Sequence, residues 1–271
     1  MFIHNAGFEA LDLDFQYLAV DTTNLKAAIA AMRAFNFAGY SIGAPNKQAI
    51  IPLLDECDDD VIKIGACNTV HNNNGKLKGY NSDWIGALNC INSRIALAGK
   101  KAVVLGAGGT SRAIIYGLKR NGAKVTILNR NLEKAQALAN NFDCAAGSIN
   151  DATKFMDYDI IINATPVGSR GLEECDCSLC RFLGLGLKFT ATGNNFILAP
   201  IFQSFSESKL ALDVVFQRNN TEFTLAAQKH NCNVIHGHEM LVEQAAFQFK
   251  LFTGSDSPKD TMYTVLKQFL D

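Results

Sequence analysis

The chain has 271 residues, of which 48% are hydrophobic and 19% charged, and its formal net charge is -1. This composition is typical of a globular protein long enough for one or two domains, each with its own core. The charge balance gives no basic surplus for binding nucleic acid, and no apolar run of about 18 residues predicts a membrane span.

The part of the chain before Lys100 mixes predicted strands and helices. Apolar residues at helical spacing between Leu25 and Phe35 predict a helix, and Asn-Asn-Asn-Gly between two strand-like runs predicts a hairpin. In chain order the predicted elements are a strand over 15–20, a helix over 25–35, a strand over 38–43, a short helix around 50–54, a hairpin over 66–71 and 77–80, and a helix over 83–92.

From Lys100 onward, strands and helices alternate, which predicts a parallel sheet covered by helices on both faces. The predicted strands are 101–105, 124–130, 158–163 and 210–216, and the predicted helices are 111–122, 131–142, 221–230, 239–252 and 259–270. The segment 171–209 is rich in Cys, Gly, Phe and Ser and shows no clean periodicity, so we assign no element to it.

The cysteines and the opening segment indicate a cytoplasmic protein. The opening, MFIHNAGFEALDLDF, has no basic region followed by an apolar core, so we expect no signal peptide. Most of the eight cysteines are scattered among apolar or helical segments, as reduced core thiols are. Cys175, Cys177 and Cys180 lie close together, but three thiols fall short of the four ligands of a zinc site. We therefore interpret them as thiols on a surface insertion and expect no metal.

A glycine-rich turn follows the strand Ala-Val-Val-Leu and precedes a helix. Gly106 permits the tight turn, Gly108 lets the backbone approach a pyrophosphate, and Ser111 is small enough for close packing of helix on strand. The helix N-terminus adds free N–H groups and a partial positive charge. A plain tight turn is the alternative. We expect the cofactor to be bound by Gly106, Ala107, Gly108, Gly109 and Thr110.

The end of the next strand favours NADP over NAD as the cofactor. An NAD enzyme usually places a carboxylate there, whereas this chain has Asn129 followed by Arg130. An arginine binds a 2′-phosphate through charge-assisted hydrogen bonds, each worth about 1.5–3 kcal/mol. The alternative is a solvated arginine at a strand end.

Taken singly, Lys47, Asn68 and Asp83 indicate no more than a loop lysine, a strand-end residue and a helix N-cap. They belong, however, to motifs in a specific order: P-N-K, L-L-D-E, I-G-A-C-N-T-V, G-Y-N-S-D-W-I-G, G-A-G-G-T-S-R-A, N-R, I-N-A-T-P-V-G and G-H-E-M-L-V-E-Q-A-A-F-Q-F. This series resembles the shikimate dehydrogenase family over nearly the whole chain apart from 171–209.

The resemblance implies an oxidoreductase of aromatic amino acid biosynthesis that interconverts 3-dehydroshikimate and shikimate with NADP. Lys47 matches the family's catalytic lysine and Asp83 its partner, while Asn68 and Gln244 match groups that hold the ring hydroxyls. Ser41 stands where the family has an asparagine and is the remaining candidate substrate ligand. The resemblance also places four residues near the cofactor: Thr165, Val214, Gly237 and Met240.

The chain departs from the family in three places. The family opens with a strand and a Ser-x-Ser-Pro segment before His-Asn, whereas here His4 and Asn5 follow almost directly on Met1. Gly43 replaces a threonine, and Phe216 replaces a tyrosine. Two alternatives follow from these departures. In the first, the enzyme acts on quinate or another hydroxylated cyclohexane carboxylate. In the second, the chain is a catalytically silent relative that binds NADP or a partner protein.

We predict an α/β protein of two domains, with an N-terminal α/β substrate domain and a Rossmann-type doubly wound NADP-binding domain. Residues 1–98, completed by the C-terminal helices within 238–271, form the substrate domain, and residues 99–237 form the NADP domain. We expect the active site between the two domains. We also expect a monomer or homodimer that acts on a small molecule. We expect it to bind neither nucleic acid nor membrane.

Overall fold

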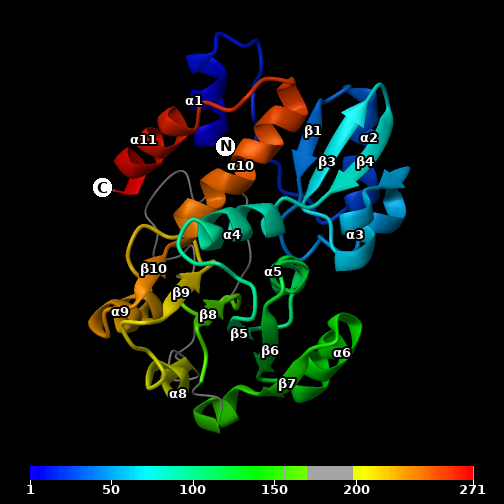
Figure 1. Cartoon of the computed structure of the whole chain (residues 1–271). Helices are drawn as coiled ribbons and strands as arrows, with labels where there is room; N and C mark the ends of the chain where they lie inside the picture. The colour runs from blue at the N-terminus through cyan, green and yellow to red at the C-terminus, as the bar shows by residue number, and fades with distance from the viewer. Residues whose placement is uncertain (155–156, 170–197, 271) are drawn as a thin grey trace.

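Two β-sheets organise the molecule in the computed structural model, which describes residues 1–154, 157–169 and 198–270 (Figure 1). One sheet has four strands in the order β1-β3-β4-β2, and the other has six parallel strands in the order β10-β9-β8-β5-β6-β7. These sheets confirm the predicted α/β class. Within the described ranges no helix has the length and apolar character that a membrane crossing requires. The expectation for Cys175, Cys177 and Cys180 concerns residues outside these ranges.

The four-stranded sheet brings Ser41 beside Thr69, because β1 pairs with β3 in antiparallel register at these residues. The predicted hairpin is confirmed, and its turn has positive φ at Asn74 and Gly75, where asparagine and glycine are favoured. The elements of this part are α1 (Phe2–Ala10), α2 (Leu25–Ala34), β1 (Gly39–Ser41), the 3-10 helix η1 (Ile51–Leu53), β2 (Glu56–Cys57), α3 (Asp59–Ile64), β3 (Thr69–Asn73), β4 (Lys76–Tyr80) and α4 (Asp83–Asn92).

The strand predicted over residues 15–20 is wrong, because this segment joins neither sheet. A side chain takes the place of a strand partner. The side-chain oxygen of Asn5 accepts a hydrogen bond from the Tyr17 N–H at 2.7 Å, and its amide donates to the Tyr17 carbonyl at 3.1 Å. Residues 15–20 therefore form a surface segment that is anchored to α1. The local apolar pattern does not distinguish such a segment from a strand.

The six-stranded sheet is buried on both faces, which explains the nearly continuous apolar strands Ile160–Asn163 and Leu210–Asp213. Because the strands are parallel, the segments that follow β5, β6, β8 and β9 meet at one edge. The elements of this part are β5 (Lys101–Leu105), α5 (Gly109–Arg120), β6 (Lys124–Asn129), α6 (Leu132–Phe142), β7 (Ala145–Ser148), η2 (Ile149–Lys154), β8 (Ile160–Asn163), α8 (Ala199–Phe202), β9 (Leu210–Asp213), α9 (Glu222–Lys229) and β10 (Asn233–Ile235).

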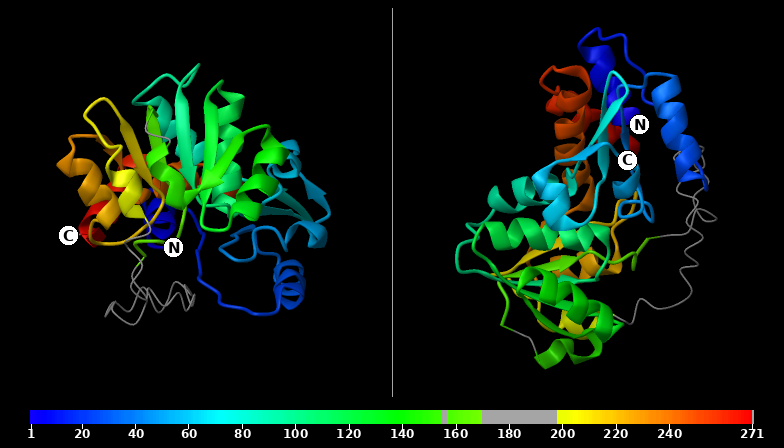
Figure 2. Two further views of the ribbon diagram at one scale, coloured as in Figure 1. Left: turned by 90° about the horizontal axis from the view of Figure 1, so that it is seen from below. Right: turned by 90° about the vertical axis from the view of Figure 1, so that its right-hand side faces the viewer.

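The last two helices, α10 (Gly237–Thr253) and α11 (Lys259–Leu270), return to the four-stranded part, where α11 packs against α1 (Figures 1 and 2). Phe249 of α10 is fully buried in the core that α1 and α11 share with it. Helix α4 packs against both α10 and α5 and so connects the two parts of the molecule. The α4–α10 contact is close at Gly86, where an added Cβ atom would lie 2.8 Å from the Met240 carbonyl oxygen.

We predict that Gly86→Ala destabilises the fold by about 1–3 kcal/mol, because the new methyl group meets backbone atoms that cannot move without separating the helices. The measurement is the urea concentration at the midpoint of unfolding. Gly43→Ala is the matched control, since an added Cβ there has no neighbour within 4 Å, and its effect should stay below about 1 kcal/mol. Equal midpoints for Gly86→Ala and wild type would contradict the close helix contact.

Candidate active site

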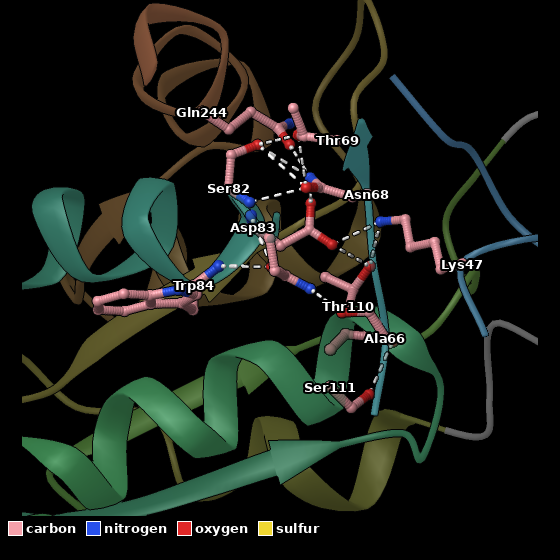
Figure 3. Close-up of polar contacts among 12 residues, drawn as sticks. Lys47, Ala66, Asn68, Thr69, Ser82, Asp83, Trp84, Thr110, Ser111 and Gln244 are labelled. Atoms are coloured by element: carbon pink, nitrogen blue, oxygen red, sulfur yellow. Dashed lines mark hydrogen bonds and ion pairs between the residues drawn. The ribbon is translucent and has the colours of Figure 1, made fainter. Parts of the chain in front are cut away.

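A buried ion pair joins two of the predicted site residues. The Lys47 ammonium lies 2.5 Å from Oδ2 of Asp83 (Figure 3). The two side chains are only 16% and 3% exposed. A charged pair with so little solvent is stable only if further hydrogen bonds satisfy both members. The surroundings of the pair supply these bonds.

The start of α4 frees the Asp83 carboxylate for the site. Ser82 is the N-cap, and Asp83 is the first helical residue. The side-chain oxygen of Asn81 accepts hydrogen bonds from the N–H groups of Asp83 and Trp84 at 3.0 and 3.4 Å. Because Asn81 satisfies these helix N–H groups, the Asp83 carboxylate does not have to cap the helix.

Asn68 lies at the centre of the polar network beside the pair and is 3% exposed. Its amide nitrogen donates to Oδ1 of Asp83 at 2.8 Å and lies 3.3 Å from the side-chain oxygen of Gln244. Its side-chain oxygen accepts from the Ser82 N–H at 2.7 Å and from the Thr69 hydroxyl at 2.8 Å. These bonds fix which way the amide points, so the structure brings Asn68, Asp83 and Gln244 together as the family motifs imply.

Ser41 joins this network through a residue that the sequence analysis did not single out. The Ser41 hydroxyl donates to the side-chain oxygen of Gln248 at 3.0 Å, and the Gln248 amide donates to the Thr69 hydroxyl at 2.9 Å. Gln248 lies one helical turn after Gln244 on α10, and it is 5% exposed. That four-residue spacing, which puts both amides on one helix face, is the signal that could have identified it.

The glycine-rich turn lies directly against the lysine. Gly106 has φ of +109°, and an added Cβ there would lie 2.8 Å from the Ala164 carbonyl oxygen, so only glycine fits. A Cβ at Gly109 would lie 3.4 Å from the Lys47 side chain. The Thr110 hydroxyl lies 3.1 Å from the Lys47 ammonium nitrogen. The predicted cofactor turn and the predicted catalytic pair are therefore neighbours, although they lie far apart in the sequence.

The other predicted cofactor residues gather at the edge where the parallel strands end. Arg130 is exposed there, and no carboxylate stands at the end of β6. At the first residue of α10, an added Cβ on Gly237 would lie 2.3 Å from the Val215 carbonyl oxygen, so glycine is required. At this edge Asn129 is the last residue of β6 and Arg130 follows it, while Thr165 follows β8 and Val214 follows β9.

The structure shows the surroundings of three residues on which the sequence analysis commented: Met240, Phe216 and Gly43. Met240 is 4% exposed and belongs to the apolar core around α4 and α5, so its place near the nicotinamide stays a prediction. Phe216 stacks on Phe269 with ring centroids 6.4 Å apart, and it has no hydroxyl to offer a substrate. Gly43 leaves open space where a threonine side chain would stand.

A second buried polar network supports Thr165 and includes Asp213, which the sequence analysis did not identify. The Asp213 carboxylate is fully buried and accepts hydrogen bonds from Asn163, Val215 and Thr221. The side-chain oxygen of Asn163 in turn accepts from the Thr165 hydroxyl at 2.6 Å. Burial raises the pKa of Asp213 to about 6, and its hydrogen bonds only partly oppose this rise.

Models of known families match three parts of the chain. A model described as the shikimate dehydrogenase substrate binding domain matches residues 1–70, and one described as shikimate/quinate 5-dehydrogenase matches residues 90–173. A model of the shikimate 5′-dehydrogenase C-terminal domain matches residues 237–267. The matches include the loop of Lys47, the glycine-rich turn and helix α10.

Individual proteins are similar over nearly the full chain. A shikimate dehydrogenase (NADP(+)) of Alkaliphilus metalliredigens is 36% identical over 264 residues, which cover 94% of this chain and 87% of that protein. The structure of shikimate 5-dehydrogenase from Thermus thermophilus with NADP(H) and shikimate has a TM-score of 0.79 at 30% identity, covering 98% of this chain and 92% of that one. A quinate dehydrogenase from Corynebacterium glutamicum with NAD also has a TM-score of 0.79, at 26% identity, with 98% and 93% covered.

We predict that Asp213 makes stability fall as pH rises from about 4 to 7. Its pKa is about 6 in the folded protein against an ordinary value of 3.8, so the folded state binds more protons in this window. The stabilisation is fully present below about pH 4 and is lost through pH 6, a loss of roughly 2–3 kcal/mol. The measurement is the free energy of unfolding of wild type and Asp213→Asn in urea across this range. As pH rises, the wild type should lose stability relative to the variant. A difference that does not change with pH would contradict the prediction.

Proposed function

The chain belongs to the shikimate dehydrogenase family, and we propose that it interconverts 3-dehydroshikimate and shikimate with NADP(H). The observation that carries this proposal is the Lys47–Asp83 pair, held at 2.5 Å beside the glycine-rich turn and beside the amides of Asn68 and Gln244. A proton donor, its carboxylate partner, polar ligands and a dinucleotide turn are the groups that reduction of a hydroxylated cyclic ketone requires.

The residues of the six-stranded part fit NADP(H). The conformation of Gly106 and the open space at Gly108 leave room for a pyrophosphate against the backbone. The first N–H groups of α5 have no acceptor within the helix and would bind the phosphates. Asn129 and the exposed Arg130 would hold the adenosine ribose and its 2′-phosphate. Thr165, Val214 and Gly237 would line the path toward the nicotinamide.

Lys47 and Asp83 supply the proton chemistry of the reaction. NADPH, when bound, supplies the hydride that adds to the carbonyl carbon of 3-dehydroshikimate. Lys47 donates an ammonium proton to the carbonyl oxygen as negative charge develops there, which forms the alcohol and leaves a neutral amine that takes a proton from water. Asp83 orients the ammonium group and balances its charge. In the reverse direction the Lys47 amine accepts the hydroxyl proton.

Asn68 and Gln244 orient the substrate ring. Asn68 is fixed by the bonds around it, so a ring hydroxyl that reaches this amide meets a group that does not reorganise. Ser41 contributes a hydroxyl at the end of the same network, next to Gln248. We propose that residues 1–98 with 238–271 form the substrate-binding domain and residues 99–237 the NADP domain. The monomeric or dimeric state and the cytoplasmic location stay predictions.

Quinate is the second candidate substrate, because the open space at Gly43 removes a side chain that would otherwise border the ring. A chain that prefers quinate would show a higher kcat/KM with quinate than with shikimate in parallel assays. The family assignment holds in either case, and the ratio decides the physiological preference.

We predict that Lys47→Met lowers kcat/KM for shikimate and NADP by about 10²–10⁴-fold, because methionine keeps the length of the side chain but has no proton to transfer. NADPH binding, followed by its fluorescence, should change less than about threefold, which separates loss of chemistry from loss of the cofactor. The control is Lys63→Met, which removes an exposed lysine of α3 and should keep wild-type turnover. Undiminished turnover by Lys47→Met would remove the lysine from the mechanism.

We predict that Arg130→Ala lowers the preference for NADP over NAD by about ten- to hundredfold, because charge-assisted bonds to the 2′-phosphate are lost. The measurement is kcat/KM for both cofactors at saturating shikimate. Lys229→Ala is the control. It removes an exposed cation that precedes β10 and so lies at the opposite edge of the sheet. A cofactor preference that is the same in wild type and Arg130→Ala would rule out this role.

A further inference from the structure

A threonine of the glycine-rich turn contacts both members of the ion pair (Figure 3). The Thr110 hydroxyl accepts a hydrogen bond from the Lys47 ammonium at 3.1 Å and donates one to Oδ2 of Asp83 at 3.4 Å. Thr110 is the second residue of α5, which belongs to the six-stranded part, whereas Lys47 and Asp83 belong to the four-stranded part. The contact therefore joins the predicted cofactor turn to the predicted proton donor.

We propose that Thr110 is a positioning residue that aims the Lys47 ammonium at the substrate oxygen. The proposal rests on the function proposed above and adds a role for the Thr110 side chain that is separate from cofactor binding.

The geometry of the ammonium group gives the physical reason. A lysine ammonium has three N–H donors in a fixed tetrahedral arrangement. Among the side chains that the structure describes, Asp83 and Thr110 are the partners of Lys47. With two donors fixed, the direction of the third is fixed as well, and that donor is free for a substrate oxygen. Without the Thr110 hydroxyl, the ammonium could rotate about its single contact with Asp83, and fewer orientations would be productive.

The side chain and the backbone of Thr110 have different tasks. Its N–H lies in the first turn of α5, where a pyrophosphate would bind, while its hydroxyl is committed to Lys47 and Asp83. Gly109, the first residue of α5, lies beside the Lys47 stem, because an added Cβ there would be 3.4 Å from the Lys47 side chain. Removing the hydroxyl should therefore slow the chemistry and leave cofactor affinity nearly unchanged. If the hydroxyl instead bound the phosphate, its removal would weaken NADPH binding and leave kcat nearly unchanged.

The test compares Thr110→Val, which keeps the shape but removes the hydroxyl, with Thr110→Ser, which keeps the hydroxyl. We expect Thr110→Val to lower kcat for shikimate oxidation by at least about tenfold while the dissociation constant of NADPH stays within about twofold of wild type. Thr110→Ser should recover kcat to within about threefold of wild type. The control is Thr264→Val on an exposed face of α11, which should match wild type in both measurements.

The outcomes separate this inference from the proposed function. If the wild type turns over shikimate and Thr110→Val has the same kcat, the positioning role is overturned but the proposed function stands. The same holds if the activity lost in Thr110→Val is explained entirely by weaker NADPH binding. Failure of Thr110→Ser to recover activity would assign the loss to packing and would also overturn it. Absence of turnover in wild type, despite NADPH binding, would overturn the proposed function and this inference with it.

Discussion

The buried ion pair of Lys47 and Asp83 lies where the two parts of the molecule meet, and Thr110 contacts it from the six-stranded part. Two charges with this little exposure require neighbours that satisfy the remaining donors and acceptors. Asn68 satisfies the carboxylate from one side and Thr110 satisfies the ammonium from the other. The pair therefore depends on residues that lie far apart in the sequence, and it would lose the Thr110 hydroxyl if α5 moved away.

Helix packing makes this arrangement possible. Gly86 allows α10 to approach α4 closely, so that Gln244 reaches Asn68, and the glycine-rich turn places Thr110 against the Lys47 ammonium. A preorganised polar site of this kind does not need to reorient when charge develops on a substrate oxygen. The same packing explains why the site is built at the junction of helices, next to the edge where the parallel strands end.

Local signals in the sequence predicted much of the fold, whereas the candidate site residues were identified from the order of motifs. The turn at Asn74 and Gly75, the glycine-rich turn at Gly106 and the helix that begins at Asp83 depend on residue conformation and capping, which a short segment reveals. The failed strand at residues 15–20 and the unforeseen role of Gln248 depend on partners distant in the sequence. Motif order supplied Lys47 and Asn68, but only the folded chain shows that Thr110 contacts the lysine.

A double-mutant cycle on the ion pair tests most directly whether Lys47 and Asp83 act as one catalytic unit. The measurement is kcat/KM for shikimate and NADP in wild type, Lys47→Met, Asp83→Asn and the double variant. If Asp83 acts through Lys47, kcat/KM of the double variant should be about the same as kcat/KM of the less active single variant. Losses that multiply, so that each substitution has its full effect in the presence of the other, would show two independent roles and contradict the account.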